Sequence, residues 1–214
     1  MLVRSIIAIL VLALSASAHS QGRPLPGRDY VELQTAQPTE TGAKIEVLEF
    51  FWYRCPHCHA LEPTLVPWVN KLPADAQFRM VPAVFNDEWA LDARIFYALE
   101  ATGYLEKFHH PLLDAIHKQG GANLKGPTYM KWVSDWLAKQ GVDIGKYDAA
   151  LRSFTVENKI KRAAQIAQAY RLEGVPALAV QGKYVISGDA RTMFPVADYL
   201  IGEARRPRGG KAGK

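Results

Sequence analysis

The chain has 214 residues, of which 49% are hydrophobic, so it is long enough to bury a core and too apolar to be disordered throughout. Its formal net charge of +5 does not indicate a nucleic-acid surface, because five basic residues and no acid lie in the last ten positions. The glycines among them predict a disordered, solvated basic tail over residues 204–214. With only 2 cysteines, a framework of several disulfides is excluded.

The N-terminal 18 residues have the pattern of a secretory signal peptide. Arg4 supplies positive charge, Ile6–Leu14 form an apolar stretch, and Ala16-Ser17-Ala18 match a cleavage site. We expect cleavage after Ala18, since the apolar stretch is too short to span a bilayer. Export would place the cysteines in an oxidising compartment, for which the bacterial periplasm is the best fit.

Hydrophobic periodicity and turn residues predict elements in the order β-α-β, helical block, α-β-β-α. Those of the first half are a short edge strand at Tyr30–Leu33, a buried strand at Lys44–Phe51, a helix from Pro56 to about Asn70, and a strand at Gln77–Val84. Inside the helix, Pro63 and Pro67 predict a kink or a break, because proline removes a helical hydrogen bond.

From Asp87 onward the apolar residues recur at helical spacing up to Phe154. The later elements are a helix at Thr155–Leu172, a strand after Pro176, a hairpin turn at Gln181-Gly182-Lys183, a strand at Tyr184–Ser187, and a helix at Arg191–Ile201. We therefore expect one domain built from residues 19–86 and 155–203, with a helical domain inserted at residues 87–154.

The only two cysteines, Cys55 and Cys58, directly follow the buried strand. Pro56 lies between them, and proline is favoured in the first turn of a helix. A strand followed by a helix in this way places Cys55 at the helix N-terminus, where unpaired amides and the helix dipole favour an anion. We expect Cys55 to be a thiolate near neutral pH, and Cys58, one turn later, to be the more buried member of a redox pair.

Three further features distinguish this chain from a bare C-x-x-C match, which alone is weak. The cysteines are preceded by Val-Leu-Glu-Phe-Phe at residues 47–51, they enclose Pro-His, and Gly-Val-Pro-Ala at residues 174–177 precedes a hairpin. With the signal peptide, the sequence resembles the DsbA family of periplasmic thiol–disulfide oxidoreductases over nearly all of its mature length. The resemblance implies a thioredoxin fold of the α/β class with an inserted all-helical domain.

The resemblance also implies a role for each matching position. Cys55 would be the exposed nucleophile, Cys58 its buried partner, and His57, beside Pro56, a group that holds the thiolate. Val175 and Pro176, joined by a cis bond, would face the disulfide and pair with substrate backbone, and Trp52 would border an apolar surface for unfolded peptide. Glu49 and Glu62 would be supporting acids.

One position departs from the pattern of the family. The family often pairs the acid at Glu49 with a lysine on the next strand, where this chain has Met80, with Arg79 on the opposite face. A buried acid without a cation tends to be protonated or hydrated. This departure puts in question the role of Glu49 in carrying the proton of Cys58.

The resulting functional prediction is a protein disulfide oxidase that gives its Cys55–Cys58 disulfide to exported proteins. Each pKa unit by which Cys55 lies below a free cysteine stabilises the reduced form by about 1.4 kcal/mol, or roughly 30 mV. We expect no dissociable cofactor and a monomer. The resemblance implies two partners: reduced or unfolded exported proteins, and a quinone-linked membrane reoxidase of the DsbB type.

Alternatives remain at this point. Residues 55–59 also fit the C-x-x-C-H motif that attaches haem c. The same fold serves disulfide isomerases and reductases, and a binding module could carry a purely structural disulfide. We expect the histidines of the helical block (His109, His110 and His117) to be surface groups and not a zinc site, because no carboxylate stands at ligand spacing. Trp132 and Trp136 are expected to be core residues.

Overall fold

The computed structural model describes residues 23–206, so the expected signal peptide and most of the expected basic tail lie outside the described residues. Five strands form one sheet in the order β1-β5-β4-β2-β3. The strands are β1 (Val31–Glu32), β2 (Ile45–Phe51), β3 (Ala76–Pro82), β4 (Ala177–Val180) and β5 (Tyr184–Ser187). Strands β2 and β3 are parallel, and the other neighbours are antiparallel. This element order confirms the predicted one.

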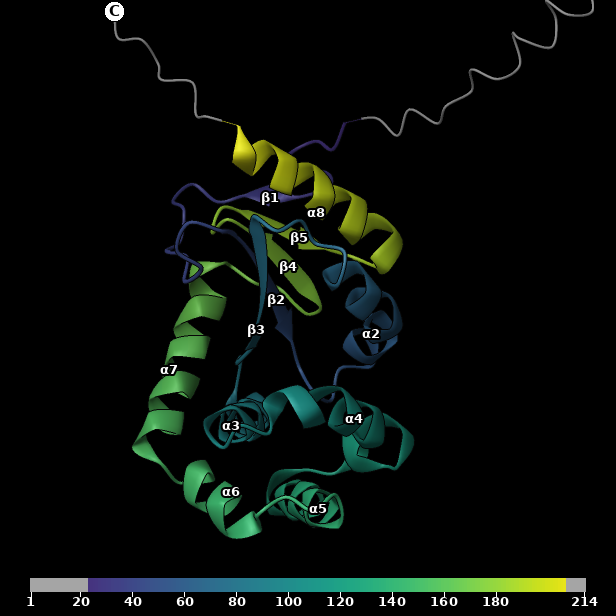
Figure 1. Ribbon diagram of the computed structural model, residues 1–214, viewed down its shortest axis with the longest axis vertical. Helices are drawn as coiled ribbons and strands as arrows, with labels where there is room; N and C mark the ends of the chain where they lie inside the picture. The colour runs from purple at the N-terminus through teal and green to yellow at the C-terminus, as the bar shows by residue number, and fades with distance from the viewer. Residues whose placement is uncertain (1–22, 207–214) are drawn as a thin grey trace, which may run out of the picture.

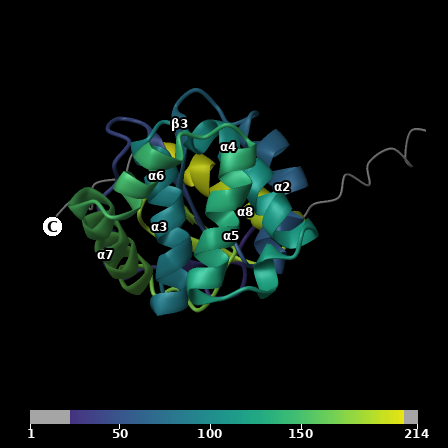
Figure 2. The same cartoon turned by 90° about the horizontal axis from the view of Figure 1, so that it is seen from below.

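Helices cover both faces of the sheet and one of its ends. They are α2 (Pro56–Val69), α3 (Asp87–Ala101), α4 (Leu105–Lys118), α5 (Gly126–Lys139), α6 (Ile144–Leu151), α7 (Phe154–Ala169) and α8 (Ala190–Arg205), with a 3-10 turn, η2, at Gly121–Asn123. Helices α2 and α8 lie on one side of the sheet, and α7 runs along the other (Figure 1). Figure 2 shows α3, α4, α5 and α6 gathered across the end of the sheet. None of the helices described has the length and apolar character needed to cross a membrane.

All seven residues of the central strand β2 are buried. Side chains alternate along a strand, so Val47 packs with the residues of α2 and α8 while Leu48 and Phe50 pack with those of α3 and α7. A strand that is buried on both faces has little freedom to slip in register. The loop that follows Phe51 therefore starts from a fixed point.

Two boundaries differ from the sequence prediction. Helix α2 runs without interruption through Pro63 and Pro67, so of the expected kink or break the break is wrong. Its buried residues Leu61 and Leu65 pack against the sheet, and such packing supplies most of the stability of a protein helix. Phe154 begins α7 instead of ending the preceding helix, because the Ser153 side chain caps α7.

The hairpin between β4 and β5 confirms the predicted turn. Gln181 and Gly182 both have positive φ, 51° and 64°, and are the central residues of a turn in which the Lys183 N–H donates to the Val180 carbonyl at 3.0 Å. A Cβ atom on Gly182 would stand 2.1 Å from the carbonyl oxygen of Gln37, so only glycine fits. The same turn fixes the N-terminal segment, because the N–H of Gln37 donates to the carbonyl of Gly182 at 2.7 Å.

Candidate active site

The first cysteine of the motif is the residue on which helix α2 begins. Its backbone N–H donates to the carbonyl of Trp52 at 3.0 Å, which turns the chain from β2 into the helix. Pro56 occupies the first turn of α2, where the missing N–H is no loss. The Sγ atom of Cys55 accepts a hydrogen bond from the backbone N–H of Cys58 at 3.3 Å, in the place of a capping oxygen. The predicted position of Cys55 at the helix N-terminus is confirmed.

The expectation that Cys55 is exposed is wrong. Cys55 is 5% exposed and Cys58 1%, so Cys55 is the more accessible thiol but only its edge reaches the surface. The cover is the loop before β4: the Cys55 Sγ lies 3.6 Å from the carbonyl oxygen of Val175. The bond between Val175 and Pro176 is cis. The Val175 carbonyl therefore covers part of the Cys55 sulfur.

The two thiols, which are free in this structure, differ in acidity. Hydrogen bonding from the Cys58 side chain, and then from the backbone N–H groups of Cys58 and His57, lowers the pKa of Cys55 to about 6, with the charge of His57 a smaller cause. Burial is the main cause that raises the pKa of Cys58, and the neighbouring Cys55 and Glu49 raise it further. Near neutral pH the site therefore carries one thiolate and one thiol.

Titrating the ultraviolet thiolate absorbance of the reduced protein is expected to give one apparent pKa near 6, against an ordinary value of about 8.5. Since the Cys58 side chain is the largest cause, Cys58→Ala should raise the pKa of Cys55. Cys58→Ser keeps a hydroxyl donor and should raise it less, which makes it the matched control. A reduced wild-type protein that titrates at the ordinary thiol value would contradict the assignment.

A groove of about 650 Å³ opens beside the dithiol. His57 and Thr64 of α2 form one wall, and Val175 and Pro176 contribute to the opposite wall. The segment from Ser187 to Arg191 also lines the groove. His57 is exposed, whereas Pro176 is buried and Val175 partly so. The groove is thus a surface on which an extended chain could lie with a sulfur near Cys55.

Glu49 lies beneath the site on the strand that leads into it. The side chain is 1% exposed, and its Oε2 atom has no hydrogen-bond partner among residues 23–206. Met80 is its register partner on β3, and Arg79, next to it, forms an ion pair with Glu46 on the other face of β2 at 2.8 Å. Burial raises the pKa of Glu49 well above its ordinary value, with the charge of Glu62 as a second cause. Burial and the neighbouring Glu62 therefore both favour the protonated form of Glu49.

Trp52 is half-buried and belongs to a buried polar cluster that the sequence did not reveal. Its ring stacks on Trp89 with the centroids 4.3 Å apart, and its Nε1–H donates to Asp92 at 2.7 Å. Arg54, directly before Cys55 and 6% exposed, forms an ion pair with Asp92 at 2.7 Å. The one signal for this cluster in the sequence is a charged residue, Arg54, at the end of a buried strand. Its partner, Asp92, lies in α3, far along the chain.

Glu62 lies further along α2 and meets α4 rather than the thiols. His110 of α4 forms an ion pair with it at 2.6 Å, and the Nε2 atom of His109 lies 4.0 Å from its carboxylate. His109 is 1% exposed, so its assignment as a surface group is wrong: Phe51 and Phe96 enclose the ring. The half-buried His117 likewise faces inward and bonds the Tyr53 carbonyl at 2.9 Å.

Attachment of haem c through residues 55–59 does not fit this geometry. Haem attachment needs both sulfurs at the edge of the porphyrin, and Cys58 is 1% exposed, on the buried face of α2. The imidazole of His59, which would be the axial ligand, bonds Asp114 at 3.0 Å and stacks on His117. These side chains pack the space that a porphyrin would need.

A thioredoxin-like sheet with an acidic and a shielded thiol at the start of its first helix defines a thiol–disulfide oxidoreductase. The comparisons with known proteins agree. A family model described as a DSBA-like thioredoxin domain matches residues 46–200. The thiol:disulfide interchange protein DsbA of Azotobacter vinelandii is 40% identical over 202 residues, which cover 92% of each chain. Its namesake from Pseudomonas aeruginosa is 40% identical over 183 residues, covering 84% of this chain and 85% of the relative.

Solved structures give the same result. The crystal structure of Pseudomonas aeruginosa DsbA matches with a TM-score of 0.77 at 38% identity, covering 85% of this chain and 95% of that one. The oxidoreductase DsbA from Xylella fastidiosa matches with a TM-score of 0.79 at 32% identity, covering 86% and 99%. The chain belongs to the DsbA family and is a thiol–disulfide oxidoreductase with a helical insertion in a thioredoxin fold.

Proposed function

We propose that this oxidoreductase works as an oxidase that gives a Cys55–Cys58 disulfide to cysteine pairs of exported proteins. The observation that carries the proposal is the lowering of the pKa of Cys55 to about 6 by hydrogen bonds at the start of α2. These hydrogen bonds stabilise a thiolate, which exists only when the disulfide is open. The reduced protein is therefore favoured, and the disulfide is readily given up.

The first step is attack by a substrate thiolate on the Sγ atom of Cys55, the more accessible of the two sulfurs. A bond forms between the substrate sulfur and Cys55, the Cys55–Cys58 bond breaks, and Cys58 leaves with the electron pair. Burial raises the pKa of Cys58, so the departing sulfur takes up a proton. We assign the donation of this proton to Glu49, whose pKa is raised by burial, with Glu62 as a supporting acid behind it.

The second step releases the enzyme. A second substrate thiolate attacks the substrate sulfur of the mixed disulfide, and Cys55 leaves as a thiolate. Its low pKa makes it a good leaving group, and the amides at the start of α2 with nearby His57 receive its charge. In total the substrate dithiol loses two electrons and becomes a disulfide, while Cys55 and Cys58 gain them.

We assign peptide binding to the groove between α2 and the loop before β4. The buried ring of Pro176 and the Val175 carbonyl fix the backbone that lies 3.6 Å from Cys55. Pro56 and His57 are exposed at the start of α2. We assign Trp52, which follows the end of β2, to the border of the same peptide-binding surface. A substrate cysteine in an extended segment would thus meet Cys55 at the edge of the groove.

The remaining assignments rest on the family and on the N-terminal sequence. We assign the protein to the bacterial periplasm, with reduced or unfolded exported proteins as substrates. A quinone-linked membrane protein of the DsbB type would reoxidise the dithiol. The catalytic steps above need no dissociable cofactor, because the electrons pass between sulfur atoms.

Reduction is expected to stabilise the fold near and above neutral pH. The pKa of Cys55 is about 6 in the folded protein and about 8.5 when unfolded. Its contribution is fully present above pH ~8.5 and is lost as the pH falls through ~6. At pH 7 we expect on the order of 1 kcal/mol, because water screens the partly accessible sulfur.

Urea unfolding of the oxidised and reduced forms at a series of pH values measures this difference. The advantage of the reduced form should shrink as the pH is lowered, and it should vanish in Cys55→Ser, whose oxidised and reduced states are the same molecule. An oxidised form that is harder to unfold at pH 7 and above would contradict the proposed source of oxidising power.

The decisive test of direction is equilibration of the protein with mixtures of reduced and oxidised glutathione. An oxidase should be reduced at reduced-glutathione levels that leave an ordinary structural disulfide intact. In a second assay it should form disulfides in a reduced unfolded protein faster than it rearranges those of a scrambled one. A disulfide that resists reduced glutathione would contradict the oxidase function. It would favour a reductase or isomerase with the same fold.

A further inference from the structure

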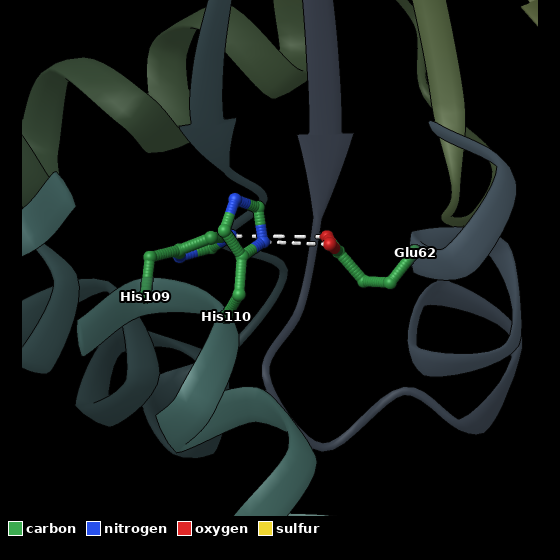
Figure 3. A group of neighbouring side chains, drawn as sticks. All are labelled: Glu62, His109 and His110. Carbon is green, nitrogen blue, oxygen red and sulfur yellow. Dashed lines mark ion pairs between the residues drawn. The ribbon is translucent and has the colours of Figure 1, made fainter. Parts of the chain in front are cut away.

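Three side chains outside the dithiol converge between α2 and α4. They are Glu62, His109 and His110, and their nearest oxygen and nitrogen atoms all lie within 4.8 Å of one another. Figure 3 shows both imidazole rings on α4 reaching toward the carboxylate that α2 holds on the other side. The sequence prediction found no carboxylate near these histidines because Glu62 is 47 positions from His109 and belongs to another helix.

The buried member of this group, His109, has a ring nitrogen without a hydrogen-bond partner among the described residues. His109 is 1% exposed, and its Nδ1 atom is hydrogen bonded to the hydroxyl of Tyr53 at 3.0 Å. Its other nitrogen, Nε2, has no hydrogen-bond partner within residues 23–206 and lies 4.0 Å from Glu62 Oε1, which is too far for a hydrogen bond. A buried polar atom without a partner is costly, and a ligand placed between the two atoms would remove that cost.

The set of ligand atoms is one that zinc prefers. Two imidazole nitrogens and one carboxylate oxygen are the ligands of zinc sites that keep a fourth position open. Bond lengths of about 2.0–2.2 Å in a tetrahedron place ligand atoms roughly 3.3 Å apart. The distances from the Glu62 carboxylate, 2.6 Å to His110 and 4.0 Å to His109, lie on either side of that value. A shift of the carboxylate by less than about 1 Å toward His109 would equalise them.

The surroundings resemble those of a metal site in two further respects. A metal-binding histidine usually has its second nitrogen hydrogen bonded, which orients the ring, and Tyr53 does this for His109. The site also has an entrance, because the His110 side chain is 48% exposed and a groove of about 450 Å³, lined by Glu62, His110, Leu113 and Asp114, opens beside it. An ion could enter there and keep one water ligand.

We propose that Glu62, His109 and His110 form a site for a divalent transition-metal ion of the zinc class, with water in the fourth position. Glu62 lies four residues after Cys58, one turn further along α2, so the site is separate from the thiols and does not use them. A bound ion would join the middle of α2 to α4. The site is independent of the direction in which the dithiol works.

The experiment must exclude the thiols, which bind zinc themselves. The mature chain is therefore used with its disulfide closed, and the absence of free thiol is checked with a thiol reagent. We expect calorimetric titration with zinc chloride to show one ion per chain, and the unfolding temperature to rise with zinc concentration. Cobalt(II) should give the visible absorption of a tetrahedral site with nitrogen and oxygen ligands, and no thiolate charge-transfer band.

Substitutions identify the ligands. His110→Ala changes a half-exposed residue, so it should fold, and it should weaken zinc binding at least tenfold. Glu62→Gln, which keeps the shape of the side chain, should do the same. The matched control is His57→Ala, an exposed histidine beside the thiols, which should leave zinc affinity unchanged. Circular dichroism checks that each variant is folded.

Two results would overturn the proposal. One is the absence of saturable zinc binding by the oxidised wild-type protein. The other is binding that persists in both His110→Ala and Glu62→Gln but is lost in His57→Ala, which would place the ion at the redox motif. Neither result would affect the glutathione equilibrium, so the proposed oxidase function is tested separately.

Discussion

Replacing Cys55 with serine is expected to reduce disulfide formation in a reduced substrate protein to the uncatalysed rate. Cys55 has the accessible sulfur and the lowered pKa, so no other group in the chain can form the mixed disulfide. Cys58→Ser keeps that sulfur but removes the partner that would resolve the adduct from the enzyme side. It should therefore lose turnover as well. If its Cys55 is first converted to a mixed disulfide by oxidised glutathione, a substrate thiolate that attacks Cys55 releases glutathione, and a covalent complex with substrate should accumulate.

The measurements are the rate of substrate oxidation and the yield of the covalent complex. This complex is seen on a non-reducing gel and is cleaved by a reducing agent. His57→Ala is the control, since its charge is only a minor cause of the lowered pKa of Cys55. That variant should remain active while its Cys55 titrates at a somewhat higher pH. Equal trapping by Cys55→Ser and Cys58→Ser would mean that the roles of the two cysteines have been assigned wrongly.

The second large effect concerns stability and the buried ion pair beside the motif. Asp92 is 0% exposed and accepts hydrogen bonds from Arg54, from the Tyr129 hydroxyl at 2.6 Å and from Trp52. Asp92→Ala would leave the guanidinium of Arg54, itself 6% exposed, buried without its main partner. Loss of one member of a buried pair costs about 3–5 kcal/mol, so we expect a loss of that size in urea unfolding.

The control for this prediction removes both charges together. The double variant Arg54→Met, Asp92→Leu leaves no buried charge unpaired, and apolar replacement of a buried pair is often close to neutral. It should recover much of the stability that Asp92→Ala loses. If Asp92→Ala unfolds at the same urea concentration as the wild type, the Arg54–Asp92 ion pair does not stabilise the contact between the end of β2 and α3.

The sequence was sufficient to predict the sheet, the helical block and the position of the dithiol because each depends on local pattern. Apolar runs, helical spacing and turn residues fix elements within about ten residues of themselves. The resemblance of residues 174–177 to the family pattern predicted both the loop that faces Cys55 and the cis bond within that loop. Met80, the departure from the family pattern, lies in register with Glu49 as strand pairing requires.

The remaining features depend on contacts between distant elements. Cys55 is covered because Val175 folds over it, and His109 is buried because the end of β2 packs on α4. Helical spacing places His109 and His110 on α4 but cannot indicate what α2 presents to them. Likewise, Arg54 alone does not identify Asp92, since many acids occur in the helical block. Partners of buried charges follow from the assembled fold.

The pairing of β2 with β4 has a consequence for how the molecule is assembled. Val47 and Val180 are register partners in the middle of the sheet, yet all the helices from α3 to α7 are synthesised between them. Contacts between such distant segments form late, because a long loop must first be closed. The ribosome has already synthesised Cys55 and α2 when Val175, whose carbonyl covers the Cys55 sulfur, is still 120 residues further along the chain. The nascent chain thus passes through an interval in which the Cys55 sulfur is uncovered and β2 lacks its neighbour β4. This interval ends only when the last fifth of the chain has been synthesised.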